Sequence, residues 1–108
     1  MHVAIRRYRT DPASVDEVMR QVNEGFIPII KASNGFLAYY ALRAGAGEIA
    51  TVSVFEDQAG AEESIRMAAD WVRGNLAALL PNPPEVIAGE VGAEELNLTG
   101  LGMRKIRE

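Results

Sequence analysis

Apolar positions recur along the chain in strand-like and helix-like periods, and these periods follow one another in a fixed order. Residues 2–9 carry apolar side chains on both faces, which predicts a strand lying between two layers. A 3.6-residue stripe then predicts a helix from Ser14 to about residue 32, and a second stripe predicts one from Asp57 to Leu80. The first stripe comprises Val15, Val18, Met19, Val22, Phe26, Ile29 and Ile30, and the second comprises Ala61, Ile65, Ala68, Ala69, Val72, Leu76, Leu79 and Leu80.

Residues with special backbone or capping properties mark the helix ends. Ser14 and Glu17 have the spacing of a capping box, and Asp57 is a suitable N-cap for the second helix. Pro28 lies inside the first stripe, so we expect a bend there, near Gly25. Asn34-Gly35 then ends this helix, because both residue types tolerate the left-handed conformation of a C-cap.

Three further strands complete the pattern. Residues 36–42 and 49–55 are predicted strands joined through Ala44–Gly47, whose glycines suit a hairpin turn. Residues 85–91 form the last predicted strand, after the prolines that end the second helix. Residues 92–108 are a tail of mixed character that either docks on a partner subunit or stays mobile.

The order strand, helix, strand, strand, helix, strand predicts an α+β domain over residues 1–91. Its expected form is ferredoxin-like βαββαβ, a four-stranded antiparallel sheet with both helices on one face. The other face would then be apolar and uncovered. A second copy of the chain is the cover that we expect, so the sequence predicts a homodimer formed through the open sheet face.

Composition narrows the classes of partner and chemistry. The chain has 108 residues, 48% of them hydrophobic, and a formal net charge of −4 without a Lys/Arg cluster, which argues against nucleic acid. Cysteine is absent and there is one histidine, so thiol chemistry and a metal site are not expected. No stretch resembles a signal peptide or a membrane span, and we expect a cytoplasmic protein without membrane contact.

Three segments carry a resemblance to a known family, namely Asn34-Gly35-Phe36, Val54-Phe55-Glu56-Asp57 and Trp71 on the second helix. Together they resemble the antibiotic biosynthesis monooxygenase-like domains of the dimeric α/β-barrel group, and the resemblance covers residues 1–91. It implies a face-to-face homodimer with a pocket between helices and sheet in each protomer. Enzymes of this group oxidise aromatic polyketide-type compounds with O2 and no metal or flavin, relatives degrade haem, and many members have no established activity.

The residues depart from the haem-degrading branch of this group. That branch pairs a first-strand asparagine with a tryptophan on the second helix and a histidine after it. Trp71 matches, but the first strand offers Arg6 and Arg7, and Pro81 follows the helix with no histidine after it. The resemblance therefore favours the branch without a cofactor, acting on a small aromatic or polyketide-like compound. The alternative is a non-catalytic homodimer that binds a small molecule or is purely structural.

The candidate substrate-binding residues follow from helix and strand geometry, and no catalytic residue stands out. Trp71 lies on a helix flank with Met67 and Asn75, and this flank either walls a pocket or packs between the helices. Tyr39 and Tyr40 point to opposite faces of their strand, so one faces the helices and one the dimer surface.

The two arginines of the first strand also lie on opposite faces. A guanidinium in mid-sheet needs either a carboxylate or an anionic ligand, because an isolated buried charge is costly. Glu90 on the neighbouring strand is a natural carboxylate partner, and Arg6 is the candidate ligand-binding residue. A third function, isomerase or cyclase, would need His2 or a carboxylate as the base.

Overall fold

Four strands form one antiparallel sheet with the order β2-β3-β1-β4. The computed structural model describes residues 1–97, so most of the predicted tail, residues 98–108, lies outside the described part. Central strand β1 pairs with β3 on one side and with β4 on the other, which brings the first and last strands together. The strands are β1 His2–Arg9, β2 Phe36–Gly45, β3 Glu48–Phe55 and β4 Glu85–Glu90.

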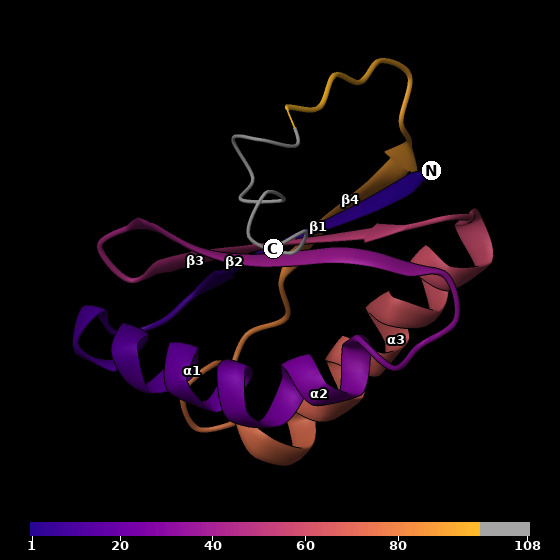
Figure 1. Ribbon diagram of the computed structural model, residues 1–108. Helices are drawn as coiled ribbons and strands as arrows, with labels where there is room; N and C mark the ends of the chain where they lie inside the picture. Colours follow the sequence, from indigo (N-terminus) through magenta and orange to yellow (C-terminus); the bar gives the residue numbers. More distant parts are fainter. Residues whose placement is uncertain (98–108) are drawn as a thin grey trace, which may run out of the picture.

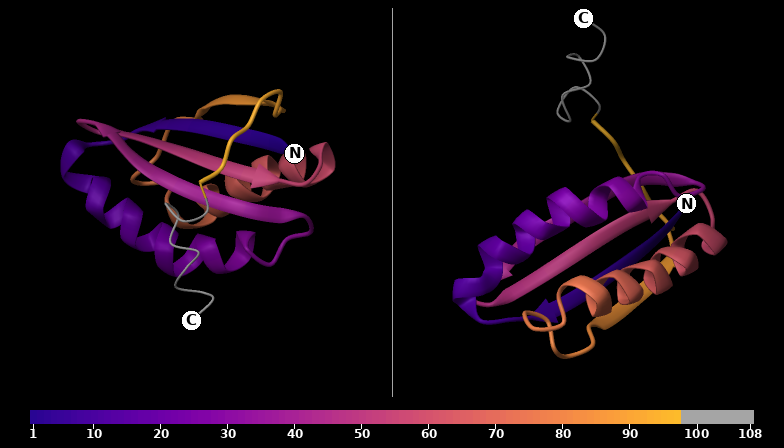
Figure 2. Two further views of the ribbon diagram at one scale, coloured as in Figure 1. Left: turned by 45° about the horizontal axis from the view of Figure 1, so that its top comes forward. Right: turned by 90° about the horizontal axis from the view of Figure 1, so that it is seen from below.

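The helices lie together on one face of this sheet, as the sequence predicted (Figure 1). Seen from the helical side, the first helical segment and α3 lie next to each other with β1 and β3 visible between them (Figure 2). No helix within residues 1–97 is long and apolar enough to cross a membrane. The helical elements are the 3-10 turn η1 Pro12–Ser14, α1 Val15–Gln21, the π-helix η2 Val22–Phe26, α2 Ile27–Ile30 and α3 Gln58–Asn75.

A π-helical stretch, η2, precedes the proline at which the sequence predicted a bend. At its end the amide of Ile27 donates to the carbonyl of Val22, one residue further back than in an α-helix. Proline has no amide proton to donate inside a helix. Pro28 lies in the first turn of α2, where no such hydrogen bond is required. The helix therefore continues past Pro28 through a widened turn.

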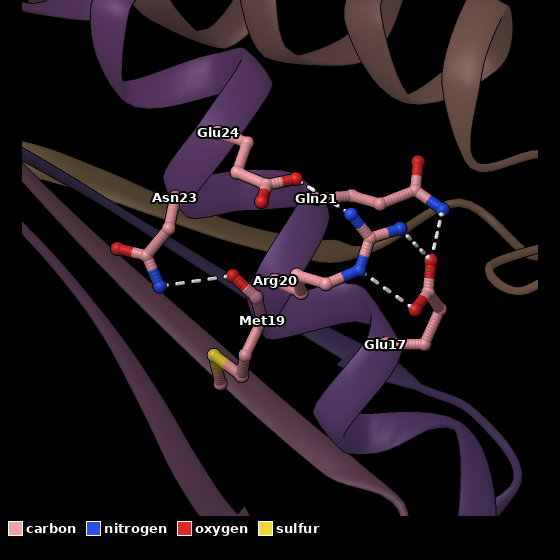
Figure 3. A network of polar contacts seen from close by, with 6 residues as sticks. All are labelled: Glu17, Met19, Arg20, Gln21, Asn23 and Glu24. Atoms are coloured by element: carbon pink, nitrogen blue, oxygen red, sulfur yellow. Dashed lines mark hydrogen bonds and ion pairs between the residues drawn. The ribbon is translucent and has the colours of Figure 1, made fainter.

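Polar side chains bridge successive turns on the exposed side of α1 and η2 (Figure 3). Arg20 donates from Nε and Nη2 to the Glu17 carboxylate at 3.0 and 2.5 Å, and from Nη1 to Glu24 at 2.6 Å. The Arg20 hydrogen bonds lower the pKa of Glu17 to about 2. Asn23 Nδ2 donates to the Met19 carbonyl at 3.0 Å, where the π-helical stretch begins. These exposed contacts fix the local geometry more than they stabilise the fold.

One predicted helix cap is confirmed and the other is wrong. Asp57 accepts a hydrogen bond from the Gly60 amide at 2.9 Å and caps α3. Ser14 makes no capping bond, because the preceding turn is capped by Asp11, which accepts from the Ala13 amide at 2.9 Å. The capping box also fails on its other side, since the Glu17 carboxylate is held by Arg20.

Helix α3 ends at Asn75, five residues before the predicted end at Leu80. The side chain of Asn75 donates to the Trp71 carbonyl one turn earlier at 2.9 Å, a local side-chain contact in the last turn of the helix. Beyond it, the amides of Leu79 and Leu80 both donate to the Leu76 carbonyl. The predicted apolar stripe still reaches the core, because Leu76 and Leu80 are buried in this turn.

The sheet face away from the helices is apolar and uncovered within residues 1–97. Strand register places alternate residues of every strand on this open face. Three of them are large hydrophobic side chains about half exposed or more, at 51% for Tyr40, 47% for Leu42 and 66% for Ile87. The face also includes Val3, Ile5, Ala38, Val52 and Val54.

Candidate functional site

A buried arginine lies at the centre of the sheet. Arg6 in β1 is opposite Thr51 of β3 and Val86 of β4, on the face that the helices cover, and only 2% of it is exposed. The predicted ion pair with Glu90 is wrong, because Glu90 lies four residues along β4 from Val86, opposite His2, and is exposed. Within residues 1–97, no carboxylate lies within 4.0 Å of Arg6.

Its neighbour Arg7 shows the contrast between the two sheet faces. Arg7 points to the open face, where its Nη2 lies 2.8 Å from Glu48 Oε1 and its Nη1 lies 4.0 Å from Glu85. That pairing raises the pKa of Arg7 and lowers that of Glu48. The exposed arginine therefore has carboxylate partners and the buried one has none in the described part of the chain.

Several polar atoms around Arg6 are buried without a hydrogen-bond partner among residues 1–97. They are Nε and Nη1 of Arg6, Oγ1 of Thr51 and Oγ of Ser53. A buried donor or acceptor left unsatisfied costs roughly 1–3 kcal/mol, and a charged group costs more. Buried polar atoms without a hydrogen-bond partner thus lie close together on β1 and β3, on the sheet face that the helices cover.

Tyr39 of β2 lies over this polar group from the neighbouring strand. Burial raises the pKa of its hydroxyl to about 12, although nearby Arg6 and Thr51 act in the opposite direction. Tyr39 is therefore a neutral phenol near pH 7, able to donate a hydrogen bond but not to act as a base. Its ring makes an edge contact with Phe26, with centroids 5.6 Å apart.

Trp71 of α3 closes the site from the helical side. Its ring is tilted against Phe26 with centroids 5.4 Å apart. A Cβ atom on Gly25 would come within 2.9 Å of the Trp71 ring, so only glycine leaves room for the indole against η2. The π-helical stretch and its glycine thus form the surface on which Trp71 packs.

These side chains enclose a small cavity between helices and sheet. Its lining includes Arg6, Tyr8, Tyr39, Thr51 and Trp71, together with aliphatic side chains of α1, η2 and α3. The free volume is about 20 Å3, which is space for about one water molecule. No histidine or carboxylate lines it in the described part of the chain, so the wall offers cation and hydroxyl groups but no base.

Two larger surface hollows adjoin the cavity. One, of about 260 Å3, lies beside the loop Pro81–Pro84 and shares Tyr8, Val72 and Leu80 with the cavity wall. The other, of about 530 Å3, lies on the outer side of α3 and shares Trp71 with it. The cavity therefore shares part of its wall with two hollows of the surface.

The structure brings three of the six predicted substrate-binding residues together and separates the others. Arg6, Tyr39 and Trp71 line the cavity. Tyr40 points to the open face, Asn75 is exposed at the end of α3, and Met67 borders the outer hollow at Trp71.

Sequence reasoning missed Tyr8 and Thr51 as residues of this wall. Both lie on the same face as Arg6, Tyr8 two residues further along β1 and Thr51 opposite Arg6 in β3. The two-residue period of the strand does place Tyr8 on the face of Arg6, but Tyr8 was not among the predicted site residues. Thr51, in contrast, depends on a strand register that the sequence does not specify.

Other site types find no support in the described residues. Within residues 1–97 there is no group of three or more His, Asp or Glu side chains that could hold a metal ion. His2 is not part of the cavity wall, so the isomerase or cyclase reading lacks a base at this site. Of the asparagine, tryptophan and histidine of the haem-degrading branch, this site has only the tryptophan, Trp71, among the described residues.

No protein-family model and no curated protein matches the chain. Solved structures do match it. A protein of unknown function from Nitrosomonas europaea superposes with a TM-score of 0.73 at 24% identity, over 89% of this chain and 93% of that one. The ActVA-Orf6 monooxygenase of Streptomyces coelicolor, in complex with nanaomycin D, gives 0.70 at 19% identity, over 89% and 91%. An antibiotic biosynthesis monooxygenase gives 0.66 at 14% identity, over 86% and 100%.

These likenesses extend over most of each chain while the identities stay low. They agree with the observed sheet order and with the placement of both helical segments on one face. The chain has the fold of the antibiotic biosynthesis monooxygenases, as the sequence resemblance predicted.

Proposed function

We propose that the protein binds a small aromatic compound in the Arg6–Tyr39–Trp71 cavity and oxidises it with O2 without a cofactor. The observation that carries this proposal is the ring cluster at the cavity, where Phe26 contacts both Trp71 and Tyr39 beside a buried cation. Flat aromatic side chains with a few polar groups among them are typical of sites for aromatic ligands. The ActVA-Orf6 monooxygenase, which has this fold and was determined with nanaomycin D, supports the same ligand class.

Binding of a ring requires the cavity to enlarge, because about 20 Å3 is much less than one benzene ring occupies. Trp71 is the wall residue best placed to move, since a hollow of about 530 Å3 lies on its outer side. The chain has one tryptophan, so its fluorescence reports on this site alone. A ligand that displaces the indole would change that signal directly.

Oxidation without a cofactor must take every electron from the substrate. When a phenol becomes a para-quinone, O2 accepts four electrons from the ring. One oxygen atom becomes the new carbonyl, and the other leaves as water with two hydrogens from the substrate. The protein contributes orientation and stabilisation of the developing anion. An apolar wall around the ring keeps competing water away from the intermediate.

The test combines oxygen uptake with Trp71 fluorescence across a panel of phenols, naphthols and anthrones. The proposal expects at least one compound to change the fluorescence and to consume one O2 per quinone formed. Fluorescence change without oxygen uptake on any compound would overturn the monooxygenase and leave a binding protein. No change with any compound at millimolar concentration would identify the ring cluster as core packing.

We also propose that two copies of the chain pair through the open sheet face. The side chains there, Tyr40, Leu42 and Ile87 among them, form the kind of exposed apolar surface that marks protein interfaces. Sedimentation velocity at micromolar concentration should give a dimer, and Leu42→Asp should give monomers. Ala59→Lys, an exposed position on the helical side, is the matched control and should leave the dimer intact. A monomeric wild-type chain would refute the pairing.

A further inference from the structure

We infer that the compound bound in this cavity carries a single anionic oxygen group, a phenolate or a carboxylate, and that Arg6 selects it. The inference rests on the proposed function for the place and the aromatic character of the ligand. It goes further in fixing the ligand's charge and the residue that recognises it.

The charge follows from the state of Arg6 in the free protein. The guanidinium is almost fully buried, two of its nitrogens have no hydrogen-bond partner, and no carboxylate within residues 1–97 neutralises it. Buried charges in proteins are paired, because burial of an isolated ion is unfavourable. A ligand oxyanion would supply the missing partner, and a charge-assisted hydrogen bond to it is among the stronger polar contacts.

Other polar groups around Arg6 fit the same ligand. The Thr51 hydroxyl is also without a partner, and the Tyr39 hydroxyl is a neutral donor. Together with the guanidinium they present donors from β1, β2 and β3 on the helix-facing side of the sheet. Among residues 1–97, Arg6 is the one cation in the cavity wall, so a monoanion is matched and a dianion would bring an unpaired negative charge into the cavity.

The absence of a base in the wall points to a ligand that binds already ionised. The titratable groups facing Arg6 are Tyr8 from its own strand and Tyr39 from β2, and neither α1, η2 nor α3 adds an acid or a histidine to the lining. No group in the described wall could accept a phenol's proton near pH 7. Arg6 would therefore favour the ionised form of a weak acid and lower that acid's pKa on binding.

The probe is 4-nitrophenol, because its phenolate absorbs at longer wavelength than its phenol and both forms are the size of one ring. We expect the dye to quench Trp71 and to be bound as phenolate about one pH unit below the pKa of the free dye. The neutral ether 4-nitroanisole should bind about 10- to 100-fold more weakly, as expected for loss of one charged hydrogen bond. Benzoate against benzamide repeats the comparison for a carboxylate.

The variants Arg6→Gln and Arg7→Gln form a matched pair, since both remove one positive charge from β1 on opposite faces of the sheet. Arg6→Gln should abolish the preference for phenolate over ether and the shift in the bound dye's absorption. Arg7→Gln should retain both. Arg6→Lys should keep part of the preference, because the charge remains while the planar fork is lost. Circular dichroism establishes that each variant is folded.

The outcomes distinguish failure of the anion inference from failure of the aromatic-binding proposal. Equal binding of nitrophenol and nitroanisole, with quenching by both, would overturn the anion inference and leave the aromatic site standing. A phenolate preference that survives in folded Arg6→Gln would also overturn it, because the selectivity would then arise elsewhere. Failure of all four probes to bind at millimolar concentration would overturn the inference together with the aromatic-binding proposal.

Discussion

Replacement of Arg6 by methionine should make the protein more stable, although Arg6 is a buried residue at the centre of the sheet. Methionine keeps an unbranched apolar stem in the same space and carries no charge. Substitution of buried ionic groups by well-packed apolar residues is often neutral or stabilising by about 1–4 kcal/mol. Arg6 lacks a carboxylate partner in the described part of the chain, so its replacement belongs at the favourable end of such cases.

The size of the effect follows from the unmet donors. Nε and Nη1 of Arg6 are both unsatisfied, and each unsatisfied buried donor costs roughly 1–3 kcal/mol. One water in the cavity could bond to one of them, since about 20 Å3 is free. The shorter methionine also leaves a small gap, which opposes the gain. We therefore expect a net increase of about 1–3 kcal/mol in the free energy of unfolding, or about 4–12 °C in Tm.

The assay is urea unfolding followed by Trp71 fluorescence and circular dichroism. Wild type and variant are compared at one protein concentration, because a dimer would make stability concentration-dependent. Arg73→Met is the control, and it should leave the midpoint almost unchanged since Arg73 is exposed on α3, away from the open sheet face. Destabilisation of Arg6→Met by more than about 1 kcal/mol would show that Arg6 is a structural residue and refute the reasoning.

Three further variants test individual parts of the structure. Tyr39→Phe should remove a dependence of stability on pH between about pH 10 and 12. The raised pKa of the Tyr39 hydroxyl stabilises the folded protein below the pKa of the unfolded chain, and this gain of about 2–3 kcal/mol is lost as the pH rises to about 12. The urea midpoint of the wild type should therefore fall more steeply over this range than that of the variant. Asp57→Ala should reduce the free energy of unfolding by about 1 kcal/mol through loss of the α3 cap, whereas an equal loss in Ser14→Ala, which removes no capping bond, would contradict this assignment. Gly25→Ala should push against the Trp71 ring, shift its emission and reduce the free energy of unfolding by about 1–3 kcal/mol, and unchanged emission would exclude the contact.

The sequence carried enough information to predict the layers of the fold. Residues such as Val18, Phe26 and Ile30 repeat at the helical period and are all buried, because one side of a surface helix must face the core. The same reasoning placed Tyr39 and Tyr40 on opposite faces of their strand. The spacing of apolar residues reflects which side of an element is buried, so it can be interpreted without knowing which element packs against that side.

Local signals at the helix ends were less informative because tertiary contacts compete with them. Ser14 has the right spacing for a cap, yet Asp11 and Pro12 form a turn just before it and Arg20 holds the Glu17 carboxylate. Leu79 and Leu80 follow the helical stripe, yet the chain leaves the helix at Asn75 and buries Leu80 through a tight turn. Apolar spacing alone does not distinguish a helix from a compact turn that reaches the same core.

The site was predictable in part for the same reason. A buried arginine on β1 followed from strand alternation, but the identity of its neighbour depends on strand register, and the prediction of Glu90 assumed a register that does not occur. Gly25 was recognised near the expected bend, but its contact with Trp71 joins residues 46 positions apart and no local pattern encodes it. Long-range contacts of this kind arise only once both helical segments pack on the sheet.

The pairing of β1 with β4 has a consequence for how the chain reaches its native state. His2 lies opposite Glu90, so the central strand acquires one of its two neighbours only after nearly the whole described sequence has been synthesised. Contacts between such distant residues slow folding because a long loop must close before they form. Until then an edge of β1 stays unpaired, open to strands from other nascent molecules. The late arrival of β4 thus completes the sheet and ends that exposure.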